Sequence, residues 1–295
     1  MHFDQFPSWL QRDIKWLENA PALLGDGTGS QELVRKSCQL LIESNQEIGE
    51  KHLEILTGRR NAALGRYFEA LVQMIITLSS EVESCHHNVA IHDGTRTCGE
   101  LDTLYKISGR WVHLELAVKF YIGVGDRSDP HQWYGPAARE TLAKKLKRLT
   151  EHQLILSRTK AGVSALDRLN ITGVHSEALV MRRLFHPILN WQENDLIRPA
   201  EISQNHSKGW WCTATETEVF TEVSDVKWRV LDKPDWLSPD NMAIPKTELN
   251  ISLPTALEEA GLTRPLMITG TLNGVELHRG FVVPDYWAPL KEKRS

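Results

Sequence analysis

One stretch of the chain alternates its side chains so regularly that it predicts a β-strand with two different faces. Residues 111–121 place apolar side chains at the even positions and ionisable or aromatic side chains at most of the odd positions. The first set is typical of a protein core. The second face consists of Trp111, His113, Glu115, Ala117, Lys119 and Tyr121.

The preceding residues predict the partner of this strand. Residues 99–107 also read as a strand, and only Ser108-Gly109 separates the two runs, which suits a two-residue hairpin turn. If Ile107 faces Arg110, then Asp102 faces Glu115. The same register places Glu100 opposite Ala117 and Cys98 opposite Lys119.

Two carboxylates that face each other across a hairpin repel unless something positive lies between them. Mg²⁺ is bound by one or two carboxylates together with water and phosphate oxygens. Asp102 and Glu115 are therefore candidate metal ligands, and Lys119 is a candidate catalytic residue on the same face. The alternative is an exposed face on which Lys119 or Arg96 forms ordinary salt bridges with the carboxylates.

Two predicted helices flank this hairpin. Residues 64–78 repeat apolar side chains every three or four positions, and Glu69 lies beside that stripe. Glu69 either reaches the hairpin or pairs with Arg66. Residues 136–158 form the later helix, opened by Gly135-Pro136. Its apolar stripe includes Gln153, which either bonds a backbone group or contacts the site.

The later helix also carries an excess of basic side chains in an acidic protein, with a formal net charge of −4. Such a cluster is either a local phosphate-binding surface or a solvated helix face. The residues predicted to bind nucleic acid are Lys144, Lys145, Lys147 and Arg148.

The remaining pattern organises the chain into three parts. Residues 1–60 read as helical, with a glycine-rich loop at 25–30 and one helix over 31–56. Residues 61–190 form the core that carries the candidate site, and residues 191–295 are rich in β-structure and tryptophan. Further strands are expected at 178–185, 226–231, 267–272 and 275–283, the last two joined by a turn at Asn273-Gly274.

Composition limits the class of protein. No apolar run approaches the roughly 20 residues that span a bilayer, and charged residues interrupt the first 20 positions, so we expect a cytoplasmic protein without membrane partners. The four cysteines fit reduced thiols better than a disulfide scaffold. Most of the ten tryptophans should pack in the core, with a base-stacking platform as the alternative.

Several longer phrases carry a resemblance to a known family. LGRYFEALV, TCGELDTLY, HLELAVKFYIG, WYGPAARETLAKKL and EHQLIL, together with RRLFHP and GWW, resemble the bacterial family called domain of unknown function 1853. The order of helix, three strands, helix and strand is similar to the core of the PD-(D/E)XK nuclease superfamily.

The superfamily resemblance implies an α/β (α+β) fold with a restriction-endonuclease-like core, in which helices flank a mixed central sheet. It implies that Asp102 and Glu115, helped by Glu69, hold Mg²⁺ or Mn²⁺ for the hydrolysis of nucleic acid, with DNA favoured. The usual lysine two residues after the glutamate is Ala117 here. Lys119 is expected to substitute for it, with Lys145 as a second candidate, and Gln153 resembles a helix glutamine found in some branches.

Two other functions compete with the nuclease. Because the lysine is missing at Ala117, the chain is alternatively a catalytically inactive nuclease-fold module that binds nucleic acid or protein. A zinc site is the third interpretation, since soft and imidazole ligands are concentrated in one short segment. Its candidate ligands are Cys85, His86, His87, His92 and Cys98.

Overall fold

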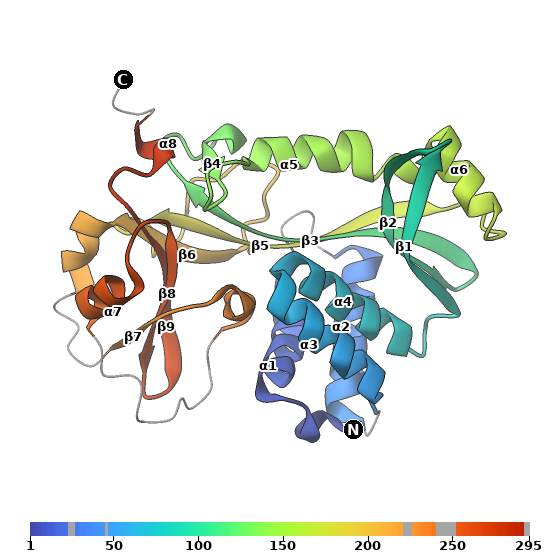
Figure 1. Ribbon diagram of the computed structural model, residues 1–295, viewed down its shortest axis with the longest axis horizontal. Helices are drawn as coiled ribbons and strands as arrows, with labels where there is room; N and C mark the ends of the chain where they lie inside the picture. The colour runs from blue at the N-terminus through green and yellow to red at the C-terminus, as the bar shows by residue number, and fades with distance from the viewer. Residues whose placement is uncertain (23–26, 45–46, 221–225, 240–251, 292–295) are drawn as a thin grey trace. The chain divides into compact units, whose positions relative to one another are not determined.

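The computed structural model describes the chain except for residues 23–26, 45–46, 221–225, 240–251 and 292–295 (Figure 1). The chain forms two compact units, and each unit is built from two separate segments of the sequence. Unit 1 comprises Met1–Lys119 and Lys145–Met181; unit 2 comprises Phe120–Lys144 and Arg182–Ser295. The predicted boundaries near residues 61 and 190 do not coincide with this division.

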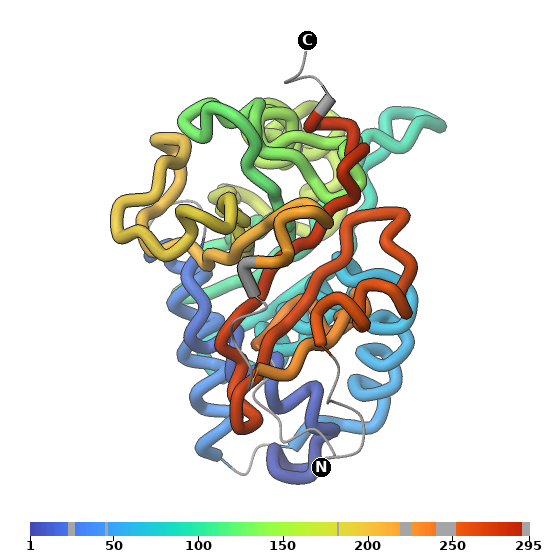
Figure 2. Tube along the Cα trace, turned by 90° about the vertical axis from the view of Figure 1, so that its left-hand side faces the viewer, coloured from blue at the N-terminus to red at the C-terminus, as the bar shows by residue number. Residues whose placement is uncertain are grey.

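Unit 1 begins with four α-helices that pack side by side (Figure 2). The predicted helix at 64–78 is confirmed, because its apolar stripe is buried. The single helix predicted over 31–56 is wrong: one helix ends at Glu43, where the Ser44 N–H donates to the Leu40 carbonyl, and another begins at Glu50. Part of the predicted loop at 25–30 lies outside the described residues. The helices are α1 (Ser8–Asn19), α2 (Gly29–Glu43), α3 (Glu50–Ala62) and α4 (Leu64–Leu78).

Four neighbouring strands of unit 1 follow the order β1-β2-β3-β5. They are β1 (Ser84–Asp93), β2 (Arg96–Ile107), β3 (Arg110–Gly123) and β5 (His175–Pro187), and the last residues of β3 and β5 belong to unit 2. Ser108 and Gly109 both have positive φ, 49° and 74°, so the two-residue hairpin turn is confirmed. Helix α4 packs against β1 and β2, and α6 (Lys160–Asp167) packs against β1.

The helix predicted over 136–158 is shorter and less regular than expected. Residues 136–139 form turns, and α5 covers only Leu142–Arg148. It continues as a π-helix over Leu149–Gln153, where the Leu154 N–H donates to the Leu149 carbonyl, and then as a 3-10 turn over Leu156–Arg158. The π-turn contains one more residue than an α-helical turn, which the spacing of three and four in the sequence did not predict.

Unit 2 is built mainly of β-structure. Strand β5 pairs with β6 and β6 with β9 in parallel, whereas β8 pairs antiparallel with β7 and β9. Asn273 and Gly274 have positive φ, which confirms the predicted turn, and Trp210, Trp211 and Trp228 are buried as expected. The elements are β4 (Trp133–Tyr134), β6 (Ser207–Thr213), β7 (Lys227–Val230), α7 (Leu253–Ala260), β8 (Leu266–Leu272), β9 (Val275–Val283) and α8 (Ala288–Lys291), with 3-10 turns at Pro130–Gln132, Ala214–Phe220 and Lys233–Trp236.

The chain is therefore a mixed α/β protein, as the sequence predicts at the level of fold class. Over the residues that the structure describes, none of the helices is both long and apolar enough to cross a membrane.

Candidate functional site

The candidate site lies where the β2–β3 ladder of unit 1 stops. The predicted register is confirmed from Ile107 opposite Arg110 to Thr103 opposite Leu114. Beyond Thr103 the ladder between these strands ends, while β2 continues to pair with β1. The predicted pairs of Asp102 with Glu115, of Glu100 with Ala117 and of Cys98 with Lys119 are therefore not part of the ladder.

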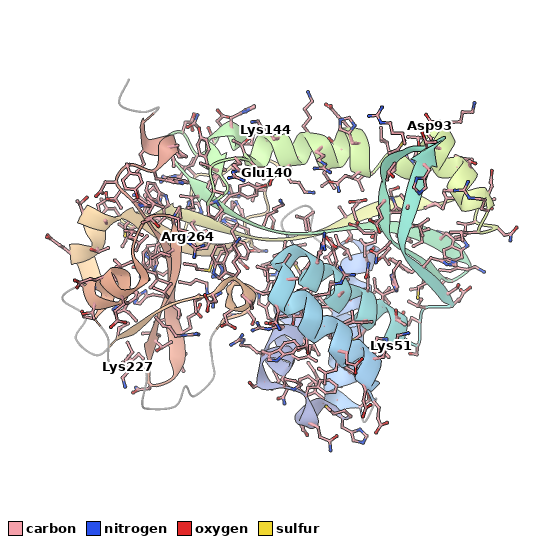
Figure 3. All side chains as sticks on the ribbon, in the orientation of Figure 1. Lys51, Asp93, Glu140, Lys144, Lys227 and Arg264 are labelled. Atoms are coloured by element: carbon pink, nitrogen blue, oxygen red, sulfur yellow. The ribbon has the colours of Figure 1, made fainter. Side chains whose placement is uncertain are left out.

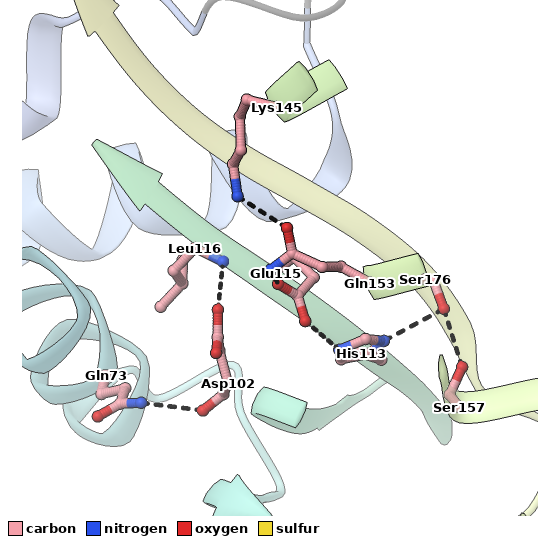
Figure 4. A network of polar contacts seen from close by, with 9 residues as sticks. All are labelled: Gln73, Asp102, His113, Glu115, Leu116, Lys145, Gln153, Ser157 and Ser176. Carbon is pink, nitrogen blue, oxygen red and sulfur yellow. Dashed lines mark hydrogen bonds and ion pairs between the residues drawn. The ribbon is translucent and has the colours of Figure 1, made fainter. Parts of the chain in front are cut away.

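Asp102 is the first residue after the ladder ends, and its side chain takes the place of a backbone partner. One carboxylate oxygen, Oδ2, accepts the Leu116 N–H at 2.9 Å. The Asp102 backbone carbonyl accepts from the Gln73 side-chain amide on α4, also at 2.9 Å (Figure 4). Two contacts to neighbouring elements thus fix the aspartate where strand pairing has been lost.

The neighbouring strand β1 is also irregular at this level. Its ladder with β2 passes from His87 opposite Thr103 to Val89 opposite Leu101, so Asn88 is left out of it. Asn88 has φ 55°, a left-handed conformation that asparagine tolerates better than most residues. Its side-chain oxygen accepts from the Gln73 amide at 3.0 Å, which ties this irregularity to Asp102.

Glu115 is buried, with 2% of its surface exposed, and both carboxylate oxygens accept or share hydrogen bonds. Oε2 accepts from the Gln153 amide at 2.6 Å, and Oε1 lies 3.2 Å from His113 Nε2. The oxygen of the same Gln153 amide accepts from Lys145 Nζ at 2.7 Å (Figure 4). The π-helix thus places one glutamine between a lysine and the buried carboxylate.

His113 extends this chain of contacts away from the carboxylates. It is fully buried, and its Nδ1 lies 3.3 Å from the hydroxyl of Ser176 on β5. That hydroxyl lies 3.0 Å from the hydroxyl of Ser157. With both ring nitrogens engaged, His113 holds Glu115 in one orientation.

The charge of Glu115 acts on Asp102. Burial, then the charge of Glu115, raises the pKa of Asp102 to about 8, although the Leu116 N–H opposes this. Glu69 on α4 belongs to the same cluster: burial, then the charges of Glu100 and Glu115, raises its pKa, while Arg66 and Arg59 oppose the rise. Glu69, Asp102 and Glu115 therefore act on one another through their charges, but within the described residues they do not form a group of three arranged to hold a metal.

The predicted basic residues occupy different positions. Lys145 is buried, with 7% exposed, and bonds Gln153 within the site, so it cannot be part of a solvated cluster. Lys144, labelled in Figure 3, is exposed, as are Lys147 and Arg148. Lys119 is half-buried on β3.

The proposed zinc ligands do not converge. His86 stacks on Trp111, whereas His87 bonds the hydroxyls of Thr77 and Thr103 on neighbouring elements. No three His, Cys, Asp or Glu side chains within the described ranges are arranged to hold a metal. The zinc interpretation is therefore wrong. The carboxylate pair differs from such a site, since Mg²⁺ takes most of its ligands from water and substrate.

Several residues of the site were not predicted from the sequence. His113 shares the face of Glu115, so period-two alternation signals its position but not its role. Asn88, Ser157 and Ser176 carry no sequence signal, since each is brought to the site by a distant strand or turn.

Comparison with curated proteins found no match, and neither did comparison with solved structures. The site must therefore be interpreted from its own geometry. Residues 12–283 of the 295-residue chain match the family described as a domain of unknown function, DUF1853, and the chain belongs to that family.

Proposed function

We propose that this chain is a Mg²⁺-dependent nuclease, with Mn²⁺ as an alternative cation, that hydrolyses phosphodiester bonds of nucleic acid, DNA being favoured. The observation that carries the proposal is the pair of Asp102 and buried Glu115: burial, then the charge of Glu115, raises the pKa of Asp102 to about 8. Paired carboxylates in such a cluster are costly unless a proton or a cation compensates them.

The donor set suits a hard divalent cation. Asp102 and Glu115 would hold it through carboxylate oxygens, with Glu69 as the third candidate, and such oxygens are the ligands that Mg²⁺ prefers. A cation held by these residues would supply polarisation of a phosphoryl oxygen and a source of hydroxide near neutral pH. A restriction-endonuclease-like core of the PD-(D/E)XK kind remains part of this proposal.

The other residues of the site hold the Glu115 carboxylate in place and bring a positive charge near it. His113 and Gln153 hold the Glu115 carboxylate from two sides, at 3.2 and 2.6 Å. Gln153 also accepts from Lys145, which puts an ammonium group one side chain away from Glu115. There it can stabilise negative charge that develops on the phosphate during hydrolysis. Lys119 remains the alternative for this role.

A second function, an inactive module that binds nucleic acid or protein, is favoured by one observation. Ala117 occupies the position where the superfamily has its lysine. In that case the carboxylate pair would still bind a cation, but no bond would be cleaved.

Cleavage of a panel of DNA and RNA substrates with Mg²⁺ and Mn²⁺ tests the proposal. The Asp102→Ala and Glu115→Gln variants serve as comparisons. Glu115→Gln keeps the side-chain volume, so we expect a folded protein with weaker Mg²⁺ binding by calorimetry and no cleavage. Full activity in Glu115→Gln would remove Glu115 from the mechanism, and wild-type Mg²⁺ binding without cleavage of any substrate would favour the inactive module.

A further inference from the structure

An open groove of about 910 Å³ leads to the carboxylate cluster within unit 1. Side chains from α3, α4, β1 and β2 line it. Glu69 and Gln73 belong both to this groove and to the site, since Gln73 also bonds the Asp102 carbonyl. Asp102 and Glu115 do not line the groove themselves, so a ligand lying in it contacts Glu69 and is one side chain, Gln73, away from Asp102.

Two arginine side chains line this groove, and their positive charges partly compensate the negative charge of its carboxylates. Arg59 on α3 and Arg66 on α4 are exposed, and both lower the pKa of Glu69 against the effects of burial and of Glu100 and Glu115. No ion pair of either side chain occurs within the described part of the chain. Arginine presents a planar fork of donors that matches phosphate oxygens.

Gly58 provides a second, independent observation. It lies inside α3, where glycine is destabilising relative to alanine. Neither packing nor conformation requires it, since a Cβ there would meet nothing within 4 Å and its φ is not positive. Because Gly58 lines the groove beside Arg59, its missing side chain leaves the helix backbone open to close approach by a ligand.

We propose that this groove binds one strand of nucleic acid through its phosphates, with Arg59 and Arg66 as the contacts, and delivers that strand to Asp102 and Glu115. This inference rests on the proposed nuclease function. The groove volume of about 910 Å³ lies within the range of pockets that enclose small ligands, about 300–1,000 Å³, so it holds a few nucleotides of one strand. A strand end or a single strand fits that size; a double helix does not.

The groove also predicts how the strand is recognised. No phenylalanine, tyrosine or tryptophan lines it among the described residues, so the stacking platforms of many single-strand binders are missing. Its carboxylates include Glu54, Glu69 and Glu100, which repel phosphate until a divalent cation compensates them. Binding should therefore depend on the cation and show little preference for base sequence.

Fluorescence anisotropy of a labelled single-stranded DNA in Ca²⁺ tests the inference on the full chain, with the same strand as a duplex for comparison. We expect Arg59→Ala with Arg66→Ala to weaken binding roughly tenfold or more. The slope of log affinity against log salt should fall by about 1.4, since each phosphate contact on a single strand contributes about 0.7. Lys36→Ala with Lys51→Ala removes the same charge from exposed positions outside the groove lining and should leave both quantities unchanged.

Gly58 supplies a test that leaves both arginines in place. Gly58→Glu should weaken binding more than Gly58→Gln, because the two variants add similar bulk but only one adds negative charge. Melting temperatures of all variants verify that they are folded.

The outcomes separate this inference from the proposed function. Loss of binding in the arginine variant without any wild-type cleavage supports the groove and overturns the catalytic proposal. Wild-type affinity and salt slope in the arginine variant overturn the groove, whatever the cleavage assay shows. Tighter binding of the duplex than of the single strand overturns the assigned substrate class.

Discussion

Asp102 makes the stability of the protein depend on pH in a direction opposite to that of most carboxylates. Burial, then the charge of Glu115, raises its pKa from 3.8 to about 8, so the folded state holds the proton more tightly than the unfolded state does. The resulting stabilisation is complete below about pH 4 and is lost as the pH rises to about 8.

We therefore expect Asp102→Asn to become more stable than the wild type as the pH rises from 5 to about 8 in EDTA. One pKa unit corresponds to about 1.4 kcal/mol, so the difference in melting temperature should grow by several degrees. Scanning calorimetry of both proteins measures it, and other titrating groups cancel in the difference. A difference that stays constant with pH would show that Asp102 is ionised throughout.

Adding Mg²⁺ should reverse the order of thermal stability of the wild type and Asp102→Asn at high pH. A cation that binds the ionised pair stabilises the wild type increasingly as the pH rises, because Asp102 must release its proton first. Asp102→Asn lacks that carboxylate and should gain little. The same calorimetry with Mg²⁺ therefore distinguishes a cation-binding site from two carboxylates that only repel each other.

At the scale of single elements, the sequence predicted the hairpin and helix α4 correctly because both are governed by local rules. The turn at Ser108-Gly109 fixed the register, and the apolar stripe fixed the bounds of α4 at Leu64–Leu78. The end of the ladder at Thr103 was not predictable, since it depends on Asn88 and Gln73 from neighbouring elements. The π-turn before Gln153 was missed for a related reason: its spacing mimics an ordinary helix.

The π-helix bears on which lysine would serve the proposed nuclease, because it places Gln153 between Lys145 and Glu115. The sequence places Lys119 on the face of Glu115, whereas Gln153 joins Lys145 to Glu115 through bonds of 2.7 and 2.6 Å. We expect Lys145→Met to lower single-turnover cleavage by about 10²–10³-fold, the usual cost of removing one charge-stabilising donor. Lys119→Met should lose much less. The reverse order would return the role to Lys119, and Mg²⁺ affinity separates loss of chemistry from loss of the cation.

Lys144, Lys147 and Arg148 are exposed basic residues of the α5 segment outside the groove lining. Replacing Lys144, Lys147 and Arg148 by glutamine should lower the salt slope of single-strand binding by about 2, at roughly 0.7 for each phosphate contact. Lys145 is left out because it is buried. An unchanged salt slope and affinity would show that these side chains do not contact phosphate groups. Lys147 already pairs with Glu151, at 3.9 Å.

At the scale of the whole molecule, the sequence predicted the mixed α/β class but not the division of the chain. A prediction made along the sequence divides the chain into domains that are each one uninterrupted segment, such as the predicted core at 61–190. The units are instead assembled from separate segments, because long-range strand pairing joins residues far apart in the chain. Residues 120–144 lie inside the predicted core yet belong to the unit that also contains the C-terminal strands.

This division predicts that a fragment ending at residue 190 does not behave as a domain. Ile122, Val124 and Phe185 are buried in a cluster of unit 2 whose other members come from beyond residue 190, including Trp211, Met267 and Phe281. Truncation would expose these side chains to water, at a cost of about 25 cal/mol for each Å² of apolar surface. We expect the fragment 1–190 to aggregate on expression, whereas the full chain elutes as a folded species in size-exclusion chromatography. A soluble, cooperatively melting fragment would contradict the division and restore the continuous domain predicted from the sequence.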